Sequence, residues 1–337
     1  MGETMRAWRT GPAAGILRLA ESPVPTPEAD EILVRVEYCG VCRTDLHVVD
    51  EEIPRHKADV VPGHQVVGTV VARGATAGRF GEGDVVGVAW LRHTCGACAW
   101  CRSGAENLCP NSEYTGWDAD GGYAEYVTVP EAYAYDLGAF VRLGASLASV
   151  APLLCAGIIG FRALKRAQLP PGGILGIYGF GSSGHLTALI AKAQGARVFA
   201  FTRGAANRAL AAELGMDYVG SATDAPPEPL DAAISFAPAG DLVPVALGAT
   251  RPGGTVVLAG IELSDIPRMA YEQTLFHERD LRTVTANTRA DGEELLAVAA
   301  GIRLSPAVTT IDFENADEAI AALREGRASG SMVLHVG

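Results

Sequence analysis

Four cysteines stand close together in the sequence, in a pattern that is typical of metal binding. They form C-x2-C-x2-C-x7-C and are Cys95, Cys98, Cys101 and Cys109. Four thiolates at these spacings complete the tetrahedral coordination of Zn(II) and leave no open position, as in structural sites. An iron–sulfur cluster uses thiolates at similar spacings, and four unrelated thiols are the third interpretation. The motif favours a structural zinc ion.

Three further candidates are scattered along the chain. They are Cys42 in Gly-Val-Cys-Arg-Thr-Asp-Leu-His, His64 in Pro-Gly-His, and Cys155 in Leu-Leu-Cys-Ala-Gly. Each is weak by itself, because a buried cysteine is usually a small hydrophobe and a lone histidine beside a turn is more often structural. Together, two cysteines and one histidine make the ligand set that leaves the fourth position of zinc open to water or an alcohol oxygen.

A glycine-rich hexapeptide with the pattern G-x-G-x-x-G follows an apolar segment at residues 174–178 and precedes a helix-like segment at 185–194. The pattern alone is weak. Between a strand and a helix, however, its glycines permit a tight turn and let a pyrophosphate approach the N-terminus of the helix. We expect a dinucleotide to contact Gly179, Gly181, Ser182, Ser183 and Gly184.

The next strand-like segment, residues 197–201, indicates which dinucleotide is bound. A carboxylate about 20 residues after the loop would bind a free 2′-hydroxyl of the adenosine ribose. The segment ends instead in Thr202 and Arg203, where the guanidinium could pair with a 2′-phosphate and the hydroxyl could donate a hydrogen bond. The sequence therefore favours NADP(H), while NAD(H) stays possible if Arg203 stacks on the adenine.

The elements that must position these residues change character along the chain. Short valine-rich segments at 32–36, 66–72, 84–89 and 124–129 are separated by Gly, Pro and Asp, which predicts antiparallel strands. From residue 174, apolar segments at 174–178, 197–201, 231–236 and 255–259 alternate with Ala-rich helical segments, which predicts a doubly wound parallel sheet. The tail, with strands at 308–313 and 332–336 flanking a helix at 316–324, is expected to return to the first domain.

Composition limits the partners of the chain. Its 337 residues suggest two domains, and 48% hydrophobic with 20% charged residues is ordinary for a globular protein. A formal net charge of −12 argues against nucleic acid as a partner, because nucleic-acid binders need a basic face. The first residues do not resemble a signal peptide, and the least charged stretch is too glycine-rich for a membrane span. We expect a cytoplasmic protein whose thiols bind metal.

The G-V-C-x-T-D-x-H segment, the P-G-H turn, the four-cysteine loop and the glycine-rich turn occur in the order that is seen in zinc-containing medium-chain alcohol dehydrogenases. The chain resembles this family over essentially its whole length. The resemblance implies an α/β protein: a mostly β, GroES-like catalytic domain over 1–150 and 287–337, and a Rossmann domain over 151–286. It also implies that Cys42, His64 and Cys155 bind the catalytic zinc, giving two zinc ions per chain.

The resemblance assigns further roles near the zinc. Asp45 would accept the free ring N–H of His64 and fix its orientation, while Thr44 and His47 would pass the alcohol proton toward solvent. Without the motif, Thr44 is an ordinary hydroxyl at a helix start and His47 a surface residue. Arg289 resembles the arginine that reaches the pyrophosphate, although a lone arginine is more often a surface charge.

By resemblance, the chain is expected to transfer a hydride between a small-molecule alcohol or aldehyde and NADP(H) or NAD(H), as a homodimer or homotetramer. Two positions depart from the family pattern: Gln65 stands in place of a glutamate and Ile159 in place of a threonine. A zinc-independent quinone or enoyl reductase is an alternative that the three candidate ligands argue against. An imine or enal reductase of the same family and a non-catalytic redox sensor stay open.

Overall fold

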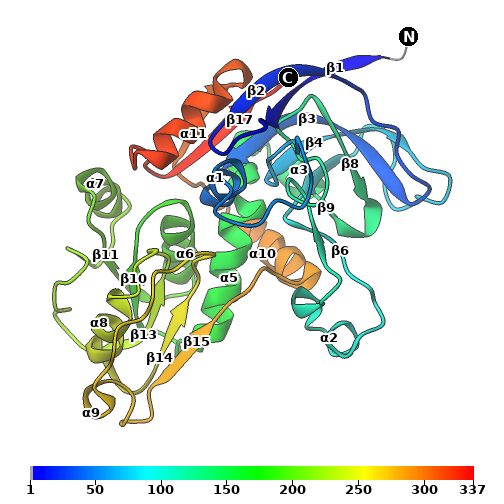
Figure 1. Cartoon of the computed structure of the whole chain (residues 1–337). Coiled ribbons are helices and arrows are strands. Elements are labelled where there is room, and N and C mark those ends of the chain that lie inside the picture. The colour runs from blue at the N-terminus through cyan, green and yellow to red at the C-terminus, as the bar shows by residue number, and fades with distance from the viewer. Residues whose placement is uncertain (1–2) are drawn as a thin grey trace. The chain divides into compact units, whose positions relative to one another are not determined.

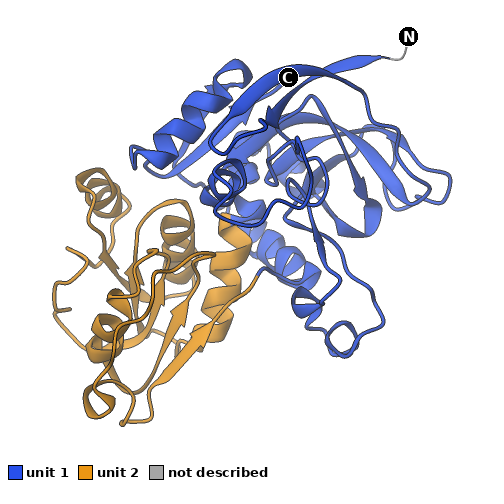
Figure 2. Cartoon of the chain, viewed as in Figure 1, with its two compact units in different colours: residues 1–155, 286–337 blue, residues 156–285 orange. Residues whose placement is uncertain are grey.

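The chain divides into two compact units in the computed structural model, which describes residues 3–337 (Figures 1 and 2). Unit 1 comprises residues 1–155 and 286–337, and unit 2 comprises residues 156–285. The first two residues of the predicted first domain lie outside the described part of the chain. The observed boundary follows residue 155, so Cys155 belongs to unit 1 rather than to the predicted Rossmann segment.

Unit 1 is built on a seven-stranded sheet with the order β16-β17-β3-β4-β5-β9, in which β8 also pairs with β3. The strands are β3 (Glu31–Val41), β4 (Val66–Arg73), β5 (Val85–Val88), β8 (Tyr126–Pro130), β9 (Ala134–Asp136), β16 (Val308–Asp312) and β17 (Ser331–His335). β-Branched residues favour this pleated, half-buried surface. A separate hairpin, β1 (Thr4–Thr10) with β2 (Leu17–Pro23), was not predicted.

The tail of the chain completes this sheet. β17 pairs antiparallel with β3, and β16 pairs parallel with β17. The predicted helix at 316–324 is observed as α11 (Ala316–Arg324), whose Ala319 and Ile320 are buried in the core of unit 1. The remaining helices of the unit that matter for the site are α1 (Arg43–Val49), which follows β3 directly, and α10 (Arg289–Gly301).

Unit 2 is a six-stranded parallel sheet with the order β12-β11-β10-β13-β14-β15. Its strands are β10 (Ile174–Tyr178), β11 (Arg197–Phe201), β12 (Tyr218–Gly220), β13 (Leu230–Ser235), β14 (Thr250–Leu258) and β15 (Asp280–Thr283). The helices are α5 (Ala156–Ala167), α6 (Ser182–Ala193), α7 (Ala205–Glu213), α8 (Leu242–Ala249) and α9 (Tyr271–Thr274). Every residue of β10 is buried, as a central parallel strand requires.

The strand order reverses at β10, which has β11 on one side and β13 on the other. In open parallel sheets, ligands bind beyond the carboxyl ends of the strands at such a reversal. The glycine-rich turn between β10 and α6 therefore stands where a nucleotide is expected.

Within residues 3–337, no single helix is long and apolar enough to cross a membrane. One bent pair, Leu147–Leu154 with Ala156–Ala167, meets the length and composition criteria together, as core helices of globular proteins also do.

Candidate functional site

Three side chains from distant parts of unit 1 meet at one point. Cys42 lies between β3 and α1, His64 lies just before β4, and Cys155 follows a short 3-10 helix, η3 (Ala151–Leu154). Their candidate ligand atoms all lie within 4.8 Å of one another. The Sγ of Cys42 is 3.3 Å from the Nε2 of His64, whose side chain is fully buried.

A buried carboxylate fixes two of these three residues. The Oδ1 of Asp45 lies 3.0 Å from the Nδ1 of His64 and accepts the backbone N–H of Gly63 at 3.0 Å. Its Oδ2 accepts the backbone N–H of Cys42 at 2.9 Å and the hydroxyl of Tyr123 at 3.4 Å. Asp45 is the third residue of α1, where a carboxylate caps the backbone ahead of the helix. One side chain thus starts the helix and orients His64.

The opposite charges in this cluster shift the pKa values of its members. Burial raises the pKa of Cys42, but the hydrogen bond from Cys155 and the charge of His64 outweigh burial, and the pKa lies well below its usual range. Burial lowers the pKa of His64, but Asp45 and Cys42 outweigh it and raise the pKa to about 10. The hydrogen bond to Cys42 and burial together raise the pKa of Cys155. A metal cation bound at this point would replace the proton of His64 as the positive partner of the buried thiolate.

The donor set fits zinc. Zinc binds cysteine sulfur at about 2.3 Å and histidine nitrogen at about 2.0–2.1 Å, so tetrahedral ligand atoms lie roughly 3.5–3.8 Å apart. The separation of 3.3 Å between Cys42 and His64 is close to this value. Two sulfurs and one nitrogen leave one coordination position free.

The four predicted cysteines also converge, in a segment we call the four-cysteine lobe: residues 94–112, which join β6 (Leu91–His93) to β7 (Glu113–Tyr114). The Sγ–Sγ distances are 3.5 Å for Cys98–Cys101, 3.5 Å for Cys95–Cys109 and 4.0 Å for Cys95–Cys101. Tetrahedral Zn–S bonds would place the sulfurs roughly 3.8 Å apart. The geometry therefore fits a closed four-sulfur zinc site.

Backbone N–H groups donate hydrogen bonds to the sulfur atoms of the lobe. The N–H of Cys98 donates to the Sγ of Cys95, and the N–H of Cys101 donates to the Sγ of Cys98, both at 3.4 Å. Hydrogen bonds from the backbone at Ala97 and Cys98 lower the pKa of Cys95 to about 6. The thiolate form that metals bind is thereby favoured.

Two residues of α1 lie beside the open donor set. Thr44, in the first turn, makes a side-chain hydrogen bond to Cys42. Without the family motif His47 would be expected on the surface, but its side chain is only 3% exposed. The Nδ1 of His47 bonds the carboxylate of Glu52, which is 43% exposed. Neither Glu52 nor Tyr123 was identified from the sequence, because no motif marks them.

The two departures from the family pattern have different surroundings. Gln65 is buried, with its side chain against Gly40, where an added Cβ would lie 2.4 Å from the Gln65 Oε1. Among residues 3–337, no acceptor lies within hydrogen-bond distance of the Gln65 amide nitrogen. Ile159 lies on α5 in unit 2 and is partly buried.

Aromatic rings border the open donor set. Trp90 meets His64 edge to face at a centroid distance of 4.8 Å, and Trp117 stacks on Trp90 at 5.8 Å with an interplanar angle of 12°. Tyr114 also stacks on Trp90, at 5.0 Å. The three rings form a flat, apolar surface beside His64.

In unit 2, the glycine-rich turn has the shape that a pyrophosphate needs. Gly179 has φ +89°, a conformation that side chains disfavour, and a Cβ on Gly184 would lie 2.1 Å from the carbonyl oxygen of Gly179. At Gly181, which precedes the first residue of α6, an added Cβ would meet no atom within 4 Å. Space is therefore open at Gly181, next to the N-terminus of α6.

Arg203 follows the end of β11, and a second arginine, Arg208, lies on α7. The side chain of Arg203 is exposed, and within the described residues it has no hydrogen-bond partner. The Nη1 of Arg208 donates to the carbonyl oxygens of Thr202 at 3.1 Å and of Arg203 at 2.5 Å. The N–H of Thr202 is bonded to the carbonyl oxygen of Gly220. This edge of unit 2 is positively charged.

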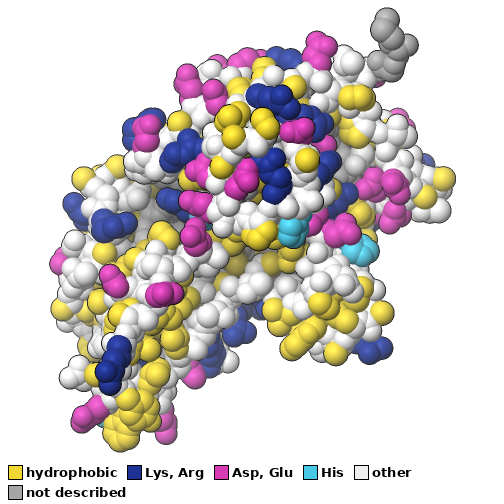
Figure 3. Space-filling view, in the orientation of Figure 1, with side chains coloured by type: hydrophobic (Ala, Val, Ile, Leu, Met, Phe, Trp, Pro, Cys, Tyr) yellow, Lys and Arg dark blue, Asp and Glu magenta, His cyan; other side chains and the backbone are white. Residues whose placement is uncertain are grey.

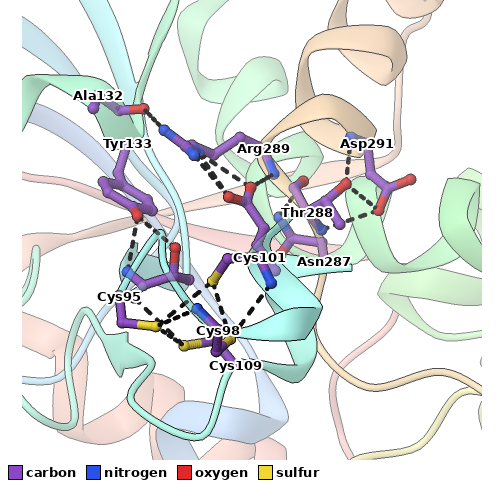
Figure 4. A network of polar contacts seen from close by, with 12 residues as sticks. Cys95, Cys98, Cys101, Cys109, Ala132, Tyr133, Asn287, Thr288, Arg289 and Asp291 are labelled. Carbon is purple, nitrogen blue, oxygen red and sulfur yellow. Dashed lines mark hydrogen bonds and ion pairs between the residues drawn. The ribbon is translucent and has the colours of Figure 1, made fainter. Parts of the chain in front are cut away.

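Arg289, the first residue of α10, is engaged by a residue of the four-cysteine lobe (Figure 4). Its Nη2 and Nε donate to Glu106 at 2.7 Å and 3.0 Å, and its backbone N–H donates to the same carboxylate at 2.8 Å. Burial raises the pKa of Glu106, but these bonds from Arg289 outweigh it and lower the pKa below its usual value. No sequence signal predicted this pair.

Comparison with known proteins agrees with the fold. Residues 28–139 match the family model "Alcohol dehydrogenase GroES-like domain", and residues 184–301 match "Zinc-binding dehydrogenase". A Mycobacterium tuberculosis (strain CDC 1551 / Oshkosh) protein named "Probable alcohol dehydrogenase AdhA" is 52% identical, covering 98% of this chain and 97% of its own.

Two solved structures have the same architecture. Acetophenone reductase from Geotrichum candidum NBRC 4597 in complex with NAD has a TM-score of 0.88 at 27% identity, covering 100% of this chain and 98% of its own. A Sinorhizobium meliloti 1021 structure bound to NADP has a TM-score of 0.89 at 25% identity, covering 99% and 100%. The predicted fold class, a GroES-like domain with a Rossmann domain, is confirmed. The chain is an oxidoreductase that belongs to the zinc-containing medium-chain alcohol dehydrogenase family.

Proposed function

We propose that the chain is a zinc-dependent alcohol dehydrogenase that interconverts an alcohol and its aldehyde or ketone, with NADP(H) preferred over NAD(H). In the oxidative direction, the carbinol hydrogen leaves as hydride to the nicotinamide and the hydroxyl hydrogen leaves as a proton. The observation that carries the proposal is the meeting of Cys42, His64 and Cys155 within 4.8 Å.

Zinc would be held in two places. Cys42, His64 and Cys155 would hold one ion with an open position, and Cys95, Cys98, Cys101 and Cys109 would hold a second ion with none. Bound at the open site, zinc lowers the pKa of an alcohol oxygen toward neutrality and so makes the hydride easier to release. The closed site would stabilise the lobe without taking part in the reaction.

The residues of α1 would handle the proton. The hydroxyl of Thr44 would take the proton from the substrate oxygen, and the buried imidazole of His47 would receive it in turn. Thr44 and His47 are three residues apart on α1, which places them on one face of the helix. Glu52, bonded to His47 and partly exposed, would stabilise the protonated imidazole and lead the proton to water. Asp45 would keep His64 in the tautomer that binds zinc.

Unit 2 would bind the dinucleotide. The pyrophosphate would lie on Gly179, Gly181, Ser182, Ser183 and Gly184, since the bare glycines leave room for it at the start of α6. Arg203, with Arg208 beside it and Thr202, would bind the 2′-phosphate of NADP(H). The relatives differ in this respect, because one solved structure contains NAD and another NADP. The exposed side chain of Arg203 is our reason to prefer NADP(H).

We also propose that the chain forms a homodimer or homotetramer through unit 2. Ile261, Ile266, Tyr271 and Phe276 are 54%, 39%, 66% and 55% exposed. They lie in the segment between β14 and the edge strand β15, and Figure 3 shows hydrophobic side chains gathered at this end of unit 2. Exposed apolar patches of this kind mark contacts between proteins.

The deciding experiment measures NADPH and NADH oxidation with a panel of aldehydes and ketones, together with zinc per chain, for the native protein and Cys42→Ser. We expect turnover with about two zinc ions per chain, and in Cys42→Ser one ion fewer with activity reduced at least about 100-fold. Cys39→Ala, which removes a buried thiol outside both donor sets, should keep both ions. Full activity with one zinc in Cys42→Ser would contradict the proposal and favour a zinc-independent reductase.

A further inference from the structure

The four-cysteine lobe has almost no hydrophobic core of its own. Its large apolar side chains, Trp100 and Leu108, are 50% and 42% exposed, and none of residues 94–112 belongs to the core cluster of unit 1. Its buried side chains are mostly polar, including Thr94 and Glu106. A segment without apolar burial depends on metal and on polar contacts for its order.

Among the polar contacts that join the lobe to the rest of unit 1, two are made by its buried residues Thr94 and Glu106. At its first residue, the backbone N–H and the hydroxyl of Thr94 bond the hydroxyl of Tyr133 at 2.8 Å and 2.9 Å. In its middle, Glu106 bonds Arg289, and the guanidinium of Arg289 lies 4.6 Å from the centre of the Tyr133 ring. Figure 4 shows that Tyr133 and Arg289 lie side by side, so the two contacts share one anchoring point.

Arg289, the partner of Glu106 in this contact, is held in place by the N-terminal cap of α10. Arg289 follows Thr288, which caps α10: the backbone N–H and hydroxyl of Thr288 donate to the buried carboxylate of Asp291 at 3.0 Å and 2.8 Å, and the N–H of Asp291 donates back at 3.1 Å. Glu106 thus bonds the first residue of a helix whose N-terminus is already capped.

The guanidinium has little capacity left for another anion. Its Nε and Nη2 are both bonded to Glu106 in a two-point arrangement, which neutralises the charge, and its Nη1 faces the carbonyl oxygen of Ala132 at 3.5 Å. The side chain of Glu106 is only 11% exposed, whereas that of Arg289 is 39% exposed. A pyrophosphate that paired with Nε and Nη2 would have to displace a buried carboxylate.

We propose that Arg289 is a positioning residue that anchors the four-cysteine lobe through Glu106, and that it does not bind the dinucleotide. The proposal rests on the proposed function in one respect, namely that the lobe holds zinc. It replaces the pyrophosphate role that the family resemblance implies for Arg289.

The test is a double-mutant cycle with Glu106→Gln, Arg289→Gln and the pair together, on the full-length zinc-loaded protein. Release of lobe zinc to a chromogenic chelator is followed in a Cys42→Ser background, where the other site lacks a ligand. Each single variant should release zinc about tenfold faster, a factor that corresponds to about 1.4 kcal/mol, and the double variant should be no faster than either. Arg289→Lys, which keeps the charge but not the two-point contact, should fall between native and Arg289→Gln.

Two further measurements separate this proposal from its alternatives. NADPH affinity, measured by calorimetry without the Cys42 change, should stay within about twofold in Arg289→Gln. Glu125→Gln is the matched control, because Glu125 likewise bonds the backbone N–H and the guanidinium of an arginine, Arg6, and it should leave zinc release unchanged.

Unchanged zinc release in both single variants would overturn the anchoring role. A tenfold loss of NADPH affinity in Arg289→Gln but not in Glu106→Gln would restore the pyrophosphate role. If the native lobe binds no zinc, the proposed function fails at that point, but limited proteolysis within residues 94–112 still tests the anchor: cleavage should be faster in both single variants than in Glu125→Gln.

Discussion

Replacing Asp45 by Asn is the sharpest test of how the open zinc site is organised. The carboxylate accepts from Gly63 and His64 on Oδ1 and from Cys42 and Tyr123 on Oδ2. An amide of the same shape keeps one oxygen, and its NH2 group must then face two donors in a site that excludes water. Loss of a hydrogen bond to a charged group costs about 1.5–3 kcal/mol.

That cost should appear mainly as weaker zinc binding, because Asp45 orients one candidate ligand and holds the backbone of another. We expect the affinity of the open site for zinc to fall about 10–100-fold, which corresponds to about 1.4–2.8 kcal/mol. Competition with a chelator of known affinity measures it, and zinc in the four-cysteine lobe reports in the same sample whether the protein is folded.

The matched control is Asp118→Asn. Asp118 also accepts from a histidine, His56, and from a backbone N–H, that of Tyr114, but it contacts no candidate ligand. It should leave zinc affinity within about twofold of native. If Asp45→Asn kept native zinc affinity with an intact lobe, the inference that this carboxylate organises the site would be wrong.

Two further predictions concern unit 2. In Arg203→Glu, NADPH affinity should fall about 10–100-fold through loss of one charge-assisted bond, while NADH affinity should change less than about threefold; equal losses, measured by calorimetry, would refute a 2′-phosphate contact. In Phe276→Glu, a charge in the exposed apolar segment should convert the oligomer to a smaller species in light scattering, and an unchanged mass would place the interface elsewhere.

Two strands of unit 2 could be predicted closely from the sequence, whereas β12 was not predicted and β14 begins before its predicted start. β10 and β11 have the predicted bounds, because a buried parallel strand is a short apolar run between turns. α6 begins at Ser182, three residues before the predicted start. Serine and glycine have low helix propensity, so the first turn was not predicted as helix. β1 was missed because Arg6 and Arg9 interrupt its apolar residues, although both arginines make ion pairs.

The candidate site was predictable where a motif marks it and not elsewhere. Cys42, His64 and Cys155 stand in recognisable segments, and the structure brings them together. Their zinc-binding role stays a prediction. Glu106 and Glu52 stand in no motif, and their partners depend on the packing of distant segments: 183 residues separate Glu106 from Arg289. Contacts of that kind follow from the tertiary structure alone.

The pairing of β17 with β3 bears on how the protein forms during synthesis. Unit 2 is one continuous segment and can fold as soon as it leaves the ribosome, but β3 waits for β17, which is made only after unit 2. At about 5–20 residues per second, the delay is roughly 15–60 s. Throughout that time the part of β3 that pairs with β17, Tyr38–Val41, is open to wrong pairing. The half that carries both cysteine-containing candidate metal sites is therefore completed after unit 2, and it is the one more exposed to aggregation on the way.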